Sequence, residues 1–292
     1  MEKRCVASFF LLPLLLSGCL SVEAVKVLAT APPYIDAGVT VSGKLYRAMK
    51  PVSDTEEYYI GKAVAARILS SYKLSDNHKL TAYVNLVGNA VALSSERPYL
   101  YGGYHFAVLD SGEINAFACP GGIVFITKGT IDAAENEDEL AAVLAHEIAH
   151  INSYDGIASI KRSRWTEALA AAGSSAAKQS GSTGVSELTG IFEGVVDDVF
   201  KTIVVNGYGK TREYAADETC LNFLSRAGYD PSKMKDFLNV LIRQGRSSEG
   251  GLLKTHPATA ERIDNIRNNL PFEKVDPSLV SLRAERFLAS LR

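Results

Sequence analysis

The pentapeptide HEIAH, residues 146–150, most constrains what this chain can fold into, because it sets three polar groups in the apolar stretch 139–153. A helix turns about 100° and rises about 1.5 Å per residue, so His146 and His150 are roughly 40° apart around the axis and about 6 Å apart along it. Two imidazoles so placed can converge on one zinc ion. Glu147 lies beside them, where it can reach a water on the metal without becoming a ligand.

The alternative is a helix that carries chance polar residues on a wet face. The chain has 5 histidines among 292 residues, so a chance HExxH pattern is expected in roughly one per cent of such sequences or fewer. Apolar neighbours such as Ala145 and Ile151 crowd the motif. Burying two imidazoles and a carboxylate there without partners would cost several kcal/mol, which favours a metal site.

A hydrolytic zinc site needs a third protein ligand. No histidine follows at the spacing HExxHxxGxxH, since residues 153–156 read SYDG. A glutamate on a second helix is the other solution, and the segment REYAAD offers Glu213 with Asp217 on the same helix face. On spacing alone Glu213 could equally lie on a solvated acidic face or pair with Arg212. If it ligates, Asp217 can accept the outer N–H of a ligand histidine.

Length and composition indicate a globular chain with one large domain or two small ones. Hydrophobic residues make up 47% and charged residues 22%, and the formal net charge is −2. Because this balance provides no basic field, nucleic acid is not an expected partner.

The N-terminus predicts a targeting segment. Lys3 and Arg4 precede an apolar run that is too short to span a bilayer comfortably. The following LSGC resembles the bacterial lipobox, in which the cysteine, here Cys19, becomes lipidated. An ordinary signal peptide or an uncleaved anchor is the alternative. Leu20 follows the cysteine, which by resemblance to outer-membrane lipoproteins suggests an outer-membrane protein facing the periplasm.

The hydrophobic pattern predicts helices around a small antiparallel sheet. Strands are expected over 104–109, 113–118 and 122–127, and a turn over 110–112. Helices are expected from Asp54, over His78–Leu93, over 136–153, over Thr211–Ala227, over Ser232–Gln244, from His256-Pro257, and towards Arg292. Residues 165–200 are rich in Ala, Gly and Ser, which suggests a loose helix or a mobile, lid-like segment.

Four other residues have less specific contexts. Cys119 and Cys220 could form a disulfide in an exported protein, and two buried free thiols are equally compatible with the sequence. His78 and His105 lie in no motif and are expected to be structural or on the surface.

Taken together, these motifs resemble the HtpX-like and CAAX-prenyl-protease-like zinc metallopeptidases, which are gluzincins. The resemblance covers about Glu57 to Leu270 and rests on motifs that occur in the family's order: INAFACPGG at 114–122, HEIAH, EYAAD at 213–217, RAGYDP at 226–231 and THP at 255–257. It implies an α+β fold: a mainly α-helical, zincin-like domain with a small, mainly antiparallel sheet. Residues 1–18 would then be a signal peptide, 19–52 a tether, and 53–292 a single metallopeptidase domain.

The resemblance also implies roles for individual residues. One Zn²⁺ would be held by His146, His150 and Glu213, with Asp217 behind a ligand histidine. Glu147 would act as the general base and as the general acid to the leaving amine.

Two further features follow from the same resemblance. A strand of Asn115, Ala116, Phe117 and Ala118 would form the edge on which an extended peptide pairs. His256 would stabilise the oxyanion or occupy the zinc in a resting state; otherwise it is a histidine at a helix N-terminus beside a proline.

The expected function is that of a lipid-anchored periplasmic zinc endopeptidase that acts on envelope or misfolded proteins. Because no stretch after the leader resembles a transmembrane helix, the chain is similar to the compact, exported branch of the family. The alternative is a periplasmic chaperone or outer-membrane assembly factor with a latent, self-blocked zinc site. The sequence leaves the oligomeric state open.

Overall fold

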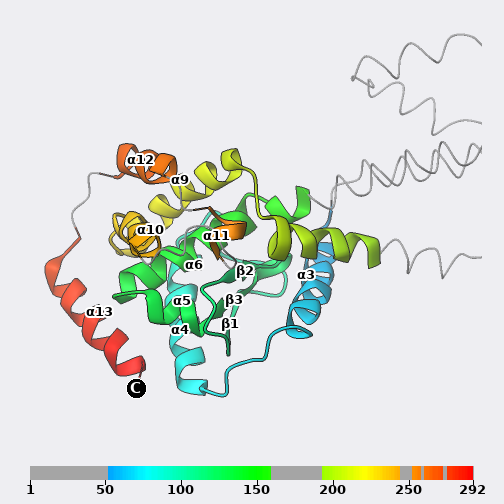
Figure 1. Ribbon diagram of the computed structural model, residues 1–292, viewed down its shortest axis with the longest axis horizontal. Helices are drawn as coiled ribbons and strands as arrows, with labels where there is room; N and C mark the ends of the chain where they lie inside the picture. The colour runs from blue at the N-terminus through cyan, green and yellow to red at the C-terminus, as the bar shows by residue number, and fades with distance from the viewer. Residues whose placement is uncertain (1–51, 159–192, 244–251, 258–259, 272–274, 292) are drawn as a thin grey trace, which may run out of the picture. The chain divides into compact units, whose positions relative to one another are not determined.

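A three-stranded sheet lies among helices in the computed structural model (Figure 1). The structure describes residues 52–158, 193–243, 252–257, 260–271 and 275–291, all of which belong to one compact unit of the chain. Several predicted features lie outside the described residues: the leader 1–18 with Cys19 in the tether that follows it, most of the segment 165–200, and the loop 245–251.

The helices form most of this unit. In chain order they are α3 (Asp54–Leu69), α4 (His78–Ala92), η2 (Pro120–Gly122), α5 (Lys128–Ala133), α6 (Glu137–Asn152), η3 (Lys201–Asn206), α9 (Lys210–Ala227), α10 (Lys233–Arg243), α11 (Leu252–Thr255), α12 (Ala260–Asn268) and α13 (Pro277–Ser290). Within the described parts of the chain, no helix combines the length and the apolar character needed to cross a membrane.

Local sequence signals set several of these helix ends. Ser53 and Glu56 form a capping box at the start of α3, since Glu56 Oε2 accepts the Ser53 N–H at 2.9 Å and Ser53 Oγ accepts the Glu56 N–H at 3.3 Å. Asn136 caps α6, and Gly228 ends α9 with a left-handed φ of 78°. The helix predicted after His256-Pro257 is present as α12, which the structure describes from Ala260, and His256 and Pro257 themselves are not helical.

The sheet contains β1 (His105–Leu109), β2 (Ala116–Ala118) and β3 (Ile123–Thr127) in the order β1-β3-β2. The α+β class is confirmed, but the sheet is mixed: β3 pairs in parallel with β1 and antiparallel with β2. The turn expected at 110–112 does not pair the following strand with β1, and residues 73–75 bond to the other edge of β1 instead. The chain therefore continues past β1 and returns on the far side of β3.

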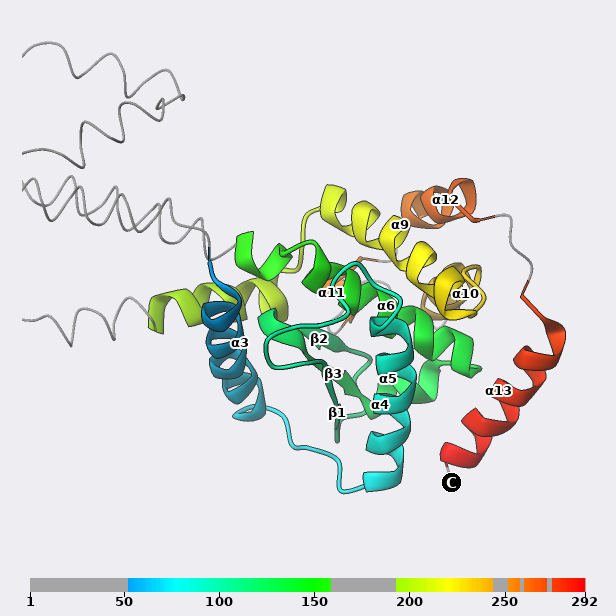
Figure 2. The same cartoon turned by 180° about the vertical axis from the view of Figure 1, so that it is seen from behind.

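The two faces of the sheet support two hydrophobic clusters, because successive side chains of a strand point to opposite faces. One face packs against α4 and α6 through Phe106, Val108, Ala116, Ala118, Val124 and Ile126. The other packs against α3 and residues 195–203 through Leu109, Phe117 and Phe125. Figure 2 shows α3 and α4 on opposite sides of the sheet.

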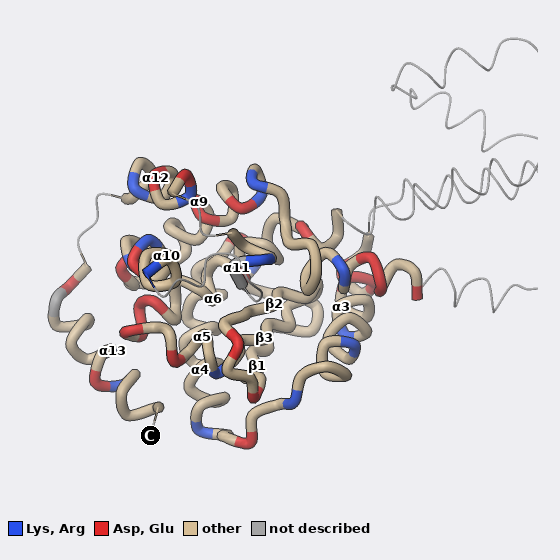
Figure 3. The backbone as a smooth tube through the Cα atoms, viewed as in Figure 1, with Lys and Arg blue, Asp and Glu red and all other residues tan. Residues whose placement is uncertain are grey.

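Helix α6 is buried along its whole length from Glu137 to Ile151. Its acidic first turn suits the positive end of the helix dipole. Glu137 accepts hydrogen bonds from Tyr83 at 2.8 Å and Tyr229 at 3.0 Å, and Asp138 pairs with Arg283 of α13 at 3.0 Å. The acidic residues of the α5–α6 turn lie between α10 and α13 (Figure 3), so the C-terminal helix is tied to the start of the helix that carries HEIAH.

The structure also places the four residues with less specific contexts. Cys119 and Cys220 are buried free thiols. His78 and His105 are exposed, and His105 Nε2 lies 2.8 Å from the carbonyl oxygen of Gly102.

Candidate metal centre and active site

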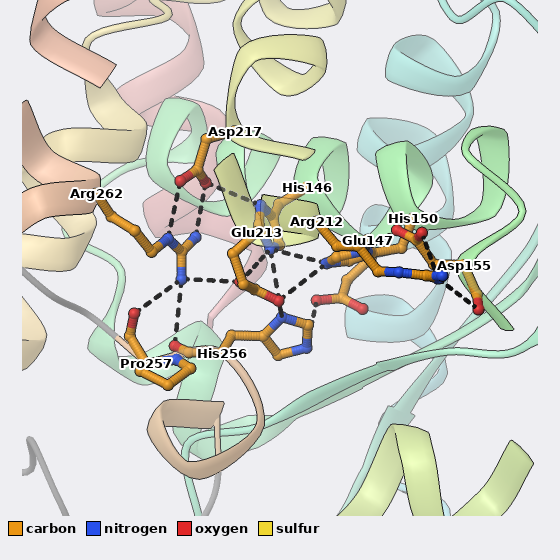
Figure 4. A network of polar contacts seen from close by, with 10 residues as sticks. All are labelled: His146, Glu147, His150, Asp155, Arg212, Glu213, Asp217, His256, Pro257 and Arg262. Atoms are coloured by element: carbon orange, nitrogen blue, oxygen red, sulfur yellow. Dashed lines mark hydrogen bonds and ion pairs between the residues drawn. The ribbon is translucent and has the colours of Figure 1, made fainter. Parts of the chain in front are cut away.

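Two imidazoles of α6 and one carboxylate of α9 converge on a common point (Figure 4). His146 Nε2 and His150 Nε2 are 3.1 Å apart, with the rings nearly perpendicular at 89°. The Glu213 carboxylate lies 3.4 Å from His146 Nε2 and 3.5 Å from His150 Nε2. The structure thus brings together the three predicted ligands.

His256 completes this group from the segment after α11. Its Nδ1 atom lies 2.9 Å from Glu213 Oε1 and 3.3 Å from His146 Nε2. All four residues are buried, and their donor atoms lie within 4.8 Å of one another. We call His146, His150, Glu213 and His256 the donor group.

The spacing of His146, His150 and Glu213 fits one tetrahedral ion. Zinc bonds of about 2.0–2.1 Å place tetrahedral ligand atoms about 3.3 Å from each other. Their donor atoms are 3.1 to 3.5 Å apart. Since the donors are nitrogen and carboxylate oxygen, their chemistry also suits zinc.

Two buried carboxylates lie behind the histidines. Asp217 Oδ1 is 3.1 Å from His146 Nδ1, and Asp155 Oδ2 is 2.7 Å from His150 Nδ1. A carboxylate at Nδ1 fixes the ring so that Nε2 faces the metal. Asp217 lies behind a ligand histidine, as the sequence predicted. Asp155 was missed by the sequence analysis, and its signal was an acid in the turn just after the HEIAH helix.

Two arginines neutralise these carboxylates. Arg262 is 2% exposed and reaches Asp217 at 2.6 and 2.8 Å and Glu213 at 3.0 Å. Arg212 pairs with Asp155 at 2.8 Å. The arginine that pairs with Glu213 is therefore Arg262 and not its sequence neighbour Arg212. No sequence signal marks Arg262 as a partner of Asp217, because 45 residues separate the two.

The electrostatics of the metal-free site favour an anionic Glu213. Burial would lower the pKa of His146, but its hydrogen bonds to Asp217 and Glu213 raise that pKa to about 9. Burial would raise the pKa of Glu213, but its interactions with His256 and His146 hold that pKa far below its usual range instead. Burial lowers the pKa of His150 in spite of Asp155. Metal binding must therefore displace a proton from His146.

Glu147 adjoins the donor group without joining it. Its side chain is 1% exposed, and neither carboxylate oxygen has a hydrogen-bond partner among the described residues. His256 Nε2 lies 3.8 Å from Glu147 Oε1. A buried carboxylate without partners indicates a place for a polar group such as water.

Strand β2 is at the edge of the sheet, as predicted for residues 115–118, although Asn115 itself precedes the strand. Cys119 N–H donates to Ile123, and the Asn115 carbonyl accepts from Thr127. Because antiparallel pairing alternates, the backbone groups of Ala116 and Ala118 point away from β3. Residues 115–118 are at most 4% exposed, backbone included, and η3 of the same chain contacts β2.

The turn before α9 supports the His256 segment. Tyr208 stacks on His150 with ring centroids 4.3 Å apart, and its N–H donates to the Thr255 carbonyl at 3.3 Å. Gly207 has a φ of 71°, and a Cβ there would overlap the Thr255 carbonyl. This close approach needs glycine and fixes the backbone next to His256.

The sequence matches peptidase family M48 over residues 78–270, which is more than half of the chain. This chain belongs to that family. The resemblance drawn from the motifs is thereby confirmed, and zinc is the metal that the family uses and that the donor group fits.

Several curated relatives are similar to the chain. The beta-barrel assembly-enhancing protease of Escherichia coli (strain K12) is 27% identical over 277 residues, which cover 93% of this chain and 55% of the relative. Metalloprotease LoiP of the same organism is 25% identical over 66% of this chain and 69% of LoiP. The mitochondrial metalloendopeptidase OMA1 of Schizosaccharomyces pombe is 29% identical over 72% of this chain and 57% of OMA1. The chain spans about half the length of the beta-barrel assembly-enhancing proteases that it matches.

Proposed function

We propose that this chain is a zinc-dependent endopeptidase of the bacterial cell envelope that hydrolyses peptide bonds in envelope or misfolded proteins. The observation that carries this proposal is Glu147. It is a buried carboxylate with no hydrogen-bond partner among the described residues, and it stands beside four converging donors. Such a group is suited to accept a proton from a water molecule at the reacting centre.

Each residue of the centre has a role in this proposal. His146, His150 and Glu213 hold the zinc, and Asp217 and Asp155 orient the two imidazoles. When bound, zinc polarises the scissile carbonyl and lowers the pKa of water. Glu147 takes the proton from the attacking water and delivers it to the leaving amine.

The edge of β2 supports a polypeptide as substrate. The outward-pointing backbone groups of Ala116 and Ala118 offer an extended chain the pairing of an added strand. Among the described residues, the Ala116 N–H already donates to the side chain of Asn115 at 3.0 Å, and because Ala116 and Ala118 are 0% and 4% exposed, a substrate strand would pair here only after this edge is uncovered.

The position of His256 favours a second candidate function. A tetrahedral zinc has four positions, so His256 Nδ1 as the fourth donor would leave none for water. The chain would then be a periplasmic chaperone or an outer-membrane assembly factor with a latent zinc site. The two candidates differ in whether His256 leaves the metal when a polypeptide binds.

The proposed location rests on the N-terminal sequence, with a leader at 1–18 and lipidation at Cys19 in a protein that faces the periplasm. A Cys19→Ser variant tests it. We expect this variant to lose the incorporation of labelled fatty acid and to leave the membrane fraction. Labelling equal to that of the wild type would contradict the proposed anchor.

The catalytic proposal is tested by zinc content and casein hydrolysis measured on three proteins. We expect one zinc per chain in the wild type, in Glu147→Gln and in Glu218→Gln, which changes an exposed glutamate of α9. Casein hydrolysis should be lost only in Glu147→Gln. Normal cleavage by Glu147→Gln would refute the mechanism, whereas a wild type that binds unfolded casein and zinc without cleavage would favour the second candidate.

A further inference from the structure

We propose that a group of tyrosines at the start of α3 is a docking surface for the interface of a phospholipid bilayer. The group consists of Tyr58, Tyr59, Tyr99 and Tyr101, which we call the tyrosine surface. This inference rests on the location proposed above, with lipidation at Cys19, and adds the face of the protein that meets the membrane.

Two segments that are distant in the sequence build the tyrosine surface. Tyr59 is 55% exposed on α3, and Tyr99 and Tyr101 are 85% and 62% exposed in the loop between α4 and β1. Half-buried Tyr58 joins the two segments, because its ring lies edge-on to Tyr59 and to Tyr101 with centroid distances of 5.3 and 5.5 Å. Large apolar side chains that cluster at the surface mark a site of interaction with a membrane or a protein.

The chemistry of the tyrosine surface suits a bilayer interface. A tyrosine ring is apolar along its body and carries a hydroxyl group at its tip, so tyrosine is enriched where acyl chains meet hydrated headgroups. The charges beside the rings balance: Lys62 Nζ lies 5.4 Å from the centroid of Tyr58, Asp54 is exposed, and Arg97 pairs with Glu57 at 2.8 Å. Docking should therefore depend on the rings and not on anionic headgroups.

The route of the chain places the tyrosine surface next to the proposed anchor. Val52 directly precedes Ser53, the cap of α3, and the first turns of this helix carry Tyr58 and Tyr59. The chain between Cys19 and Val52 spans at most about 115 Å when fully extended. An anchor at Cys19 therefore keeps the protein close to the bilayer and attaches it through the helix that bears two of the rings.

A second exposed apolar face lies on α13, where Leu279, Leu282 and Leu288 are 44% to 57% exposed. Helices α3 and α13 are at opposite ends of the described unit (Figures 1 and 2). One bilayer therefore contacts only one of the two faces. Because the proposed anchor attaches to α3, the tyrosine surface is the one that meets the membrane, and α13 supplies matched control positions.

The tyrosine surface also adjoins one end of strand β2. Helix α3 packs against η2, which follows this strand, and a Cβ at Gly121 of η2 would lie 2.7 Å from the Cα atom of Tyr58. A bilayer docked on the tyrosine surface would thus lie beside the end of the sheet edge that the proposed function assigns to the substrate. This position suits substrates that are themselves envelope proteins.

The first test measures how close two labels lie to the lipid when the lipidated full chain is reconstituted into phosphatidylcholine vesicles. Tyr101→Cys and Leu288→Cys replace side chains of similar exposure, 62% and 57%, and carry the same fluorophore; the thiols of Cys119 and Cys220 are buried and do not react in the folded chain. We expect a lipid with a nitroxide at its headgroup to quench the Tyr101→Cys label about threefold more strongly than the Leu288→Cys label. Equal quenching, or stronger quenching at Leu288→Cys, would overturn the proposal and leave the tyrosine surface to a protein partner.

The second test removes the neighbouring rings. Tyr59→Ser together with Tyr99→Ser, in the labelled Tyr101→Cys chain, should lower the quenching to that of the label on α13. Leu279→Ser together with Leu282→Ser is the matched control and should leave the quenching unchanged. Thermal unfolding verifies that each variant is folded. Unchanged quenching without the two rings, or quenching that appears only when anionic lipid is added, would overturn the proposal.

The docking surface and the proposed function can fail separately. Incorporation of labelled fatty acid into the wild type and Cys19→Ser tests the anchor alone. The ratio of the two labels is measured on vesicle-bound chains only, so it decides the docking surface whichever part of the chain attaches the protein. Hydrolysis of soluble casein tests the endopeptidase and should be the same with and without Tyr59 and Tyr99.

Discussion

Asp155 lies directly behind His150, with Oδ2 2.7 Å from the Nδ1 atom of the imidazole. Its other oxygen is held by Arg212 at 2.8 Å. The relationship mirrors that of Asp217 with His146, where Arg262 holds the carboxylate. Each histidine of HEIAH is therefore backed by an aspartate and an arginine.

Removal of this support should weaken metal binding. Asp155→Ala is expected to lower zinc affinity about 10- to 100-fold, because His150 loses the partner that fixes its ring. Competition with a chromogenic chelator measures the change. Asp198→Ala, at an exposed position, is the control and should bind zinc like the wild type. Equal affinity in Asp155→Ala would show that Asp155 does not orient the ligand.

Removal of His256 should activate the enzyme. Because its Nδ1 lies within the donor group, we expect His256→Ala to retain zinc on three ligands and to hydrolyse casein severalfold faster than the wild type. Zinc content and initial rates are measured on the same preparation. A fall in rate with full zinc occupancy would instead assign His256 to stabilisation of the oxyanion.

The metal-free protein should lose stability with rising pH as its zinc affinity increases. The pKa of His146 is raised from 6.5 to about 9 in the folded chain, so the protonated ring stabilises the fold fully below pH 6.5 and less as pH approaches 9. Zinc needs the neutral ring, so binding releases a proton in this window. Thermal unfolding with a chelator and calorimetry in buffers of different ionisation heat measure the two effects. Metal-free stability that rises between pH 6.5 and 9 would contradict this linkage.

Glycine at position 61 should give a more stable protein than alanine at that position, although alanine is the better helix former. A Cβ at Gly61 would overlap the carbonyl oxygen of Pro120, where α3 meets the turn after β2. We expect Gly61→Ala to lower the free energy of unfolding by about 2–3 kcal/mol through overpacking. Urea unfolding measures this, with exposed Lys62→Ala as the control. A stabilised Gly61→Ala would mean that α3 can move away from the turn.

The sequence predicted those features that local spacing determines. Helical geometry predicts the convergence of His146 and His150, and capping residues such as Asn136 set the helix ends. The resemblance to the family's motifs identified Glu213 as the third metal ligand. The spacing of residues in the sequence alone did not decide whether Glu213 is a ligand. The arginines that hold the aspartates of the site could not be predicted, because these pairs form by tertiary packing. For example, 57 residues separate Arg212 from Asp155. The parallel pairing of β1 was also unpredictable, because a turn signal specifies a reversal of the chain and not the neighbouring strand.

His146 and His256 are 110 residues apart in the chain. An ion bound to both would close a loop of this length in the folded chain, and its binding free energy would add to the stability of the fold because the unfolded chain does not keep these ligands together. Inside this loop lie α9 and α10, which also pack on α6. The metal would therefore hold the two halves of the sequence together as well as supply the chemistry, and its removal would loosen the C-terminal helices before the sheet.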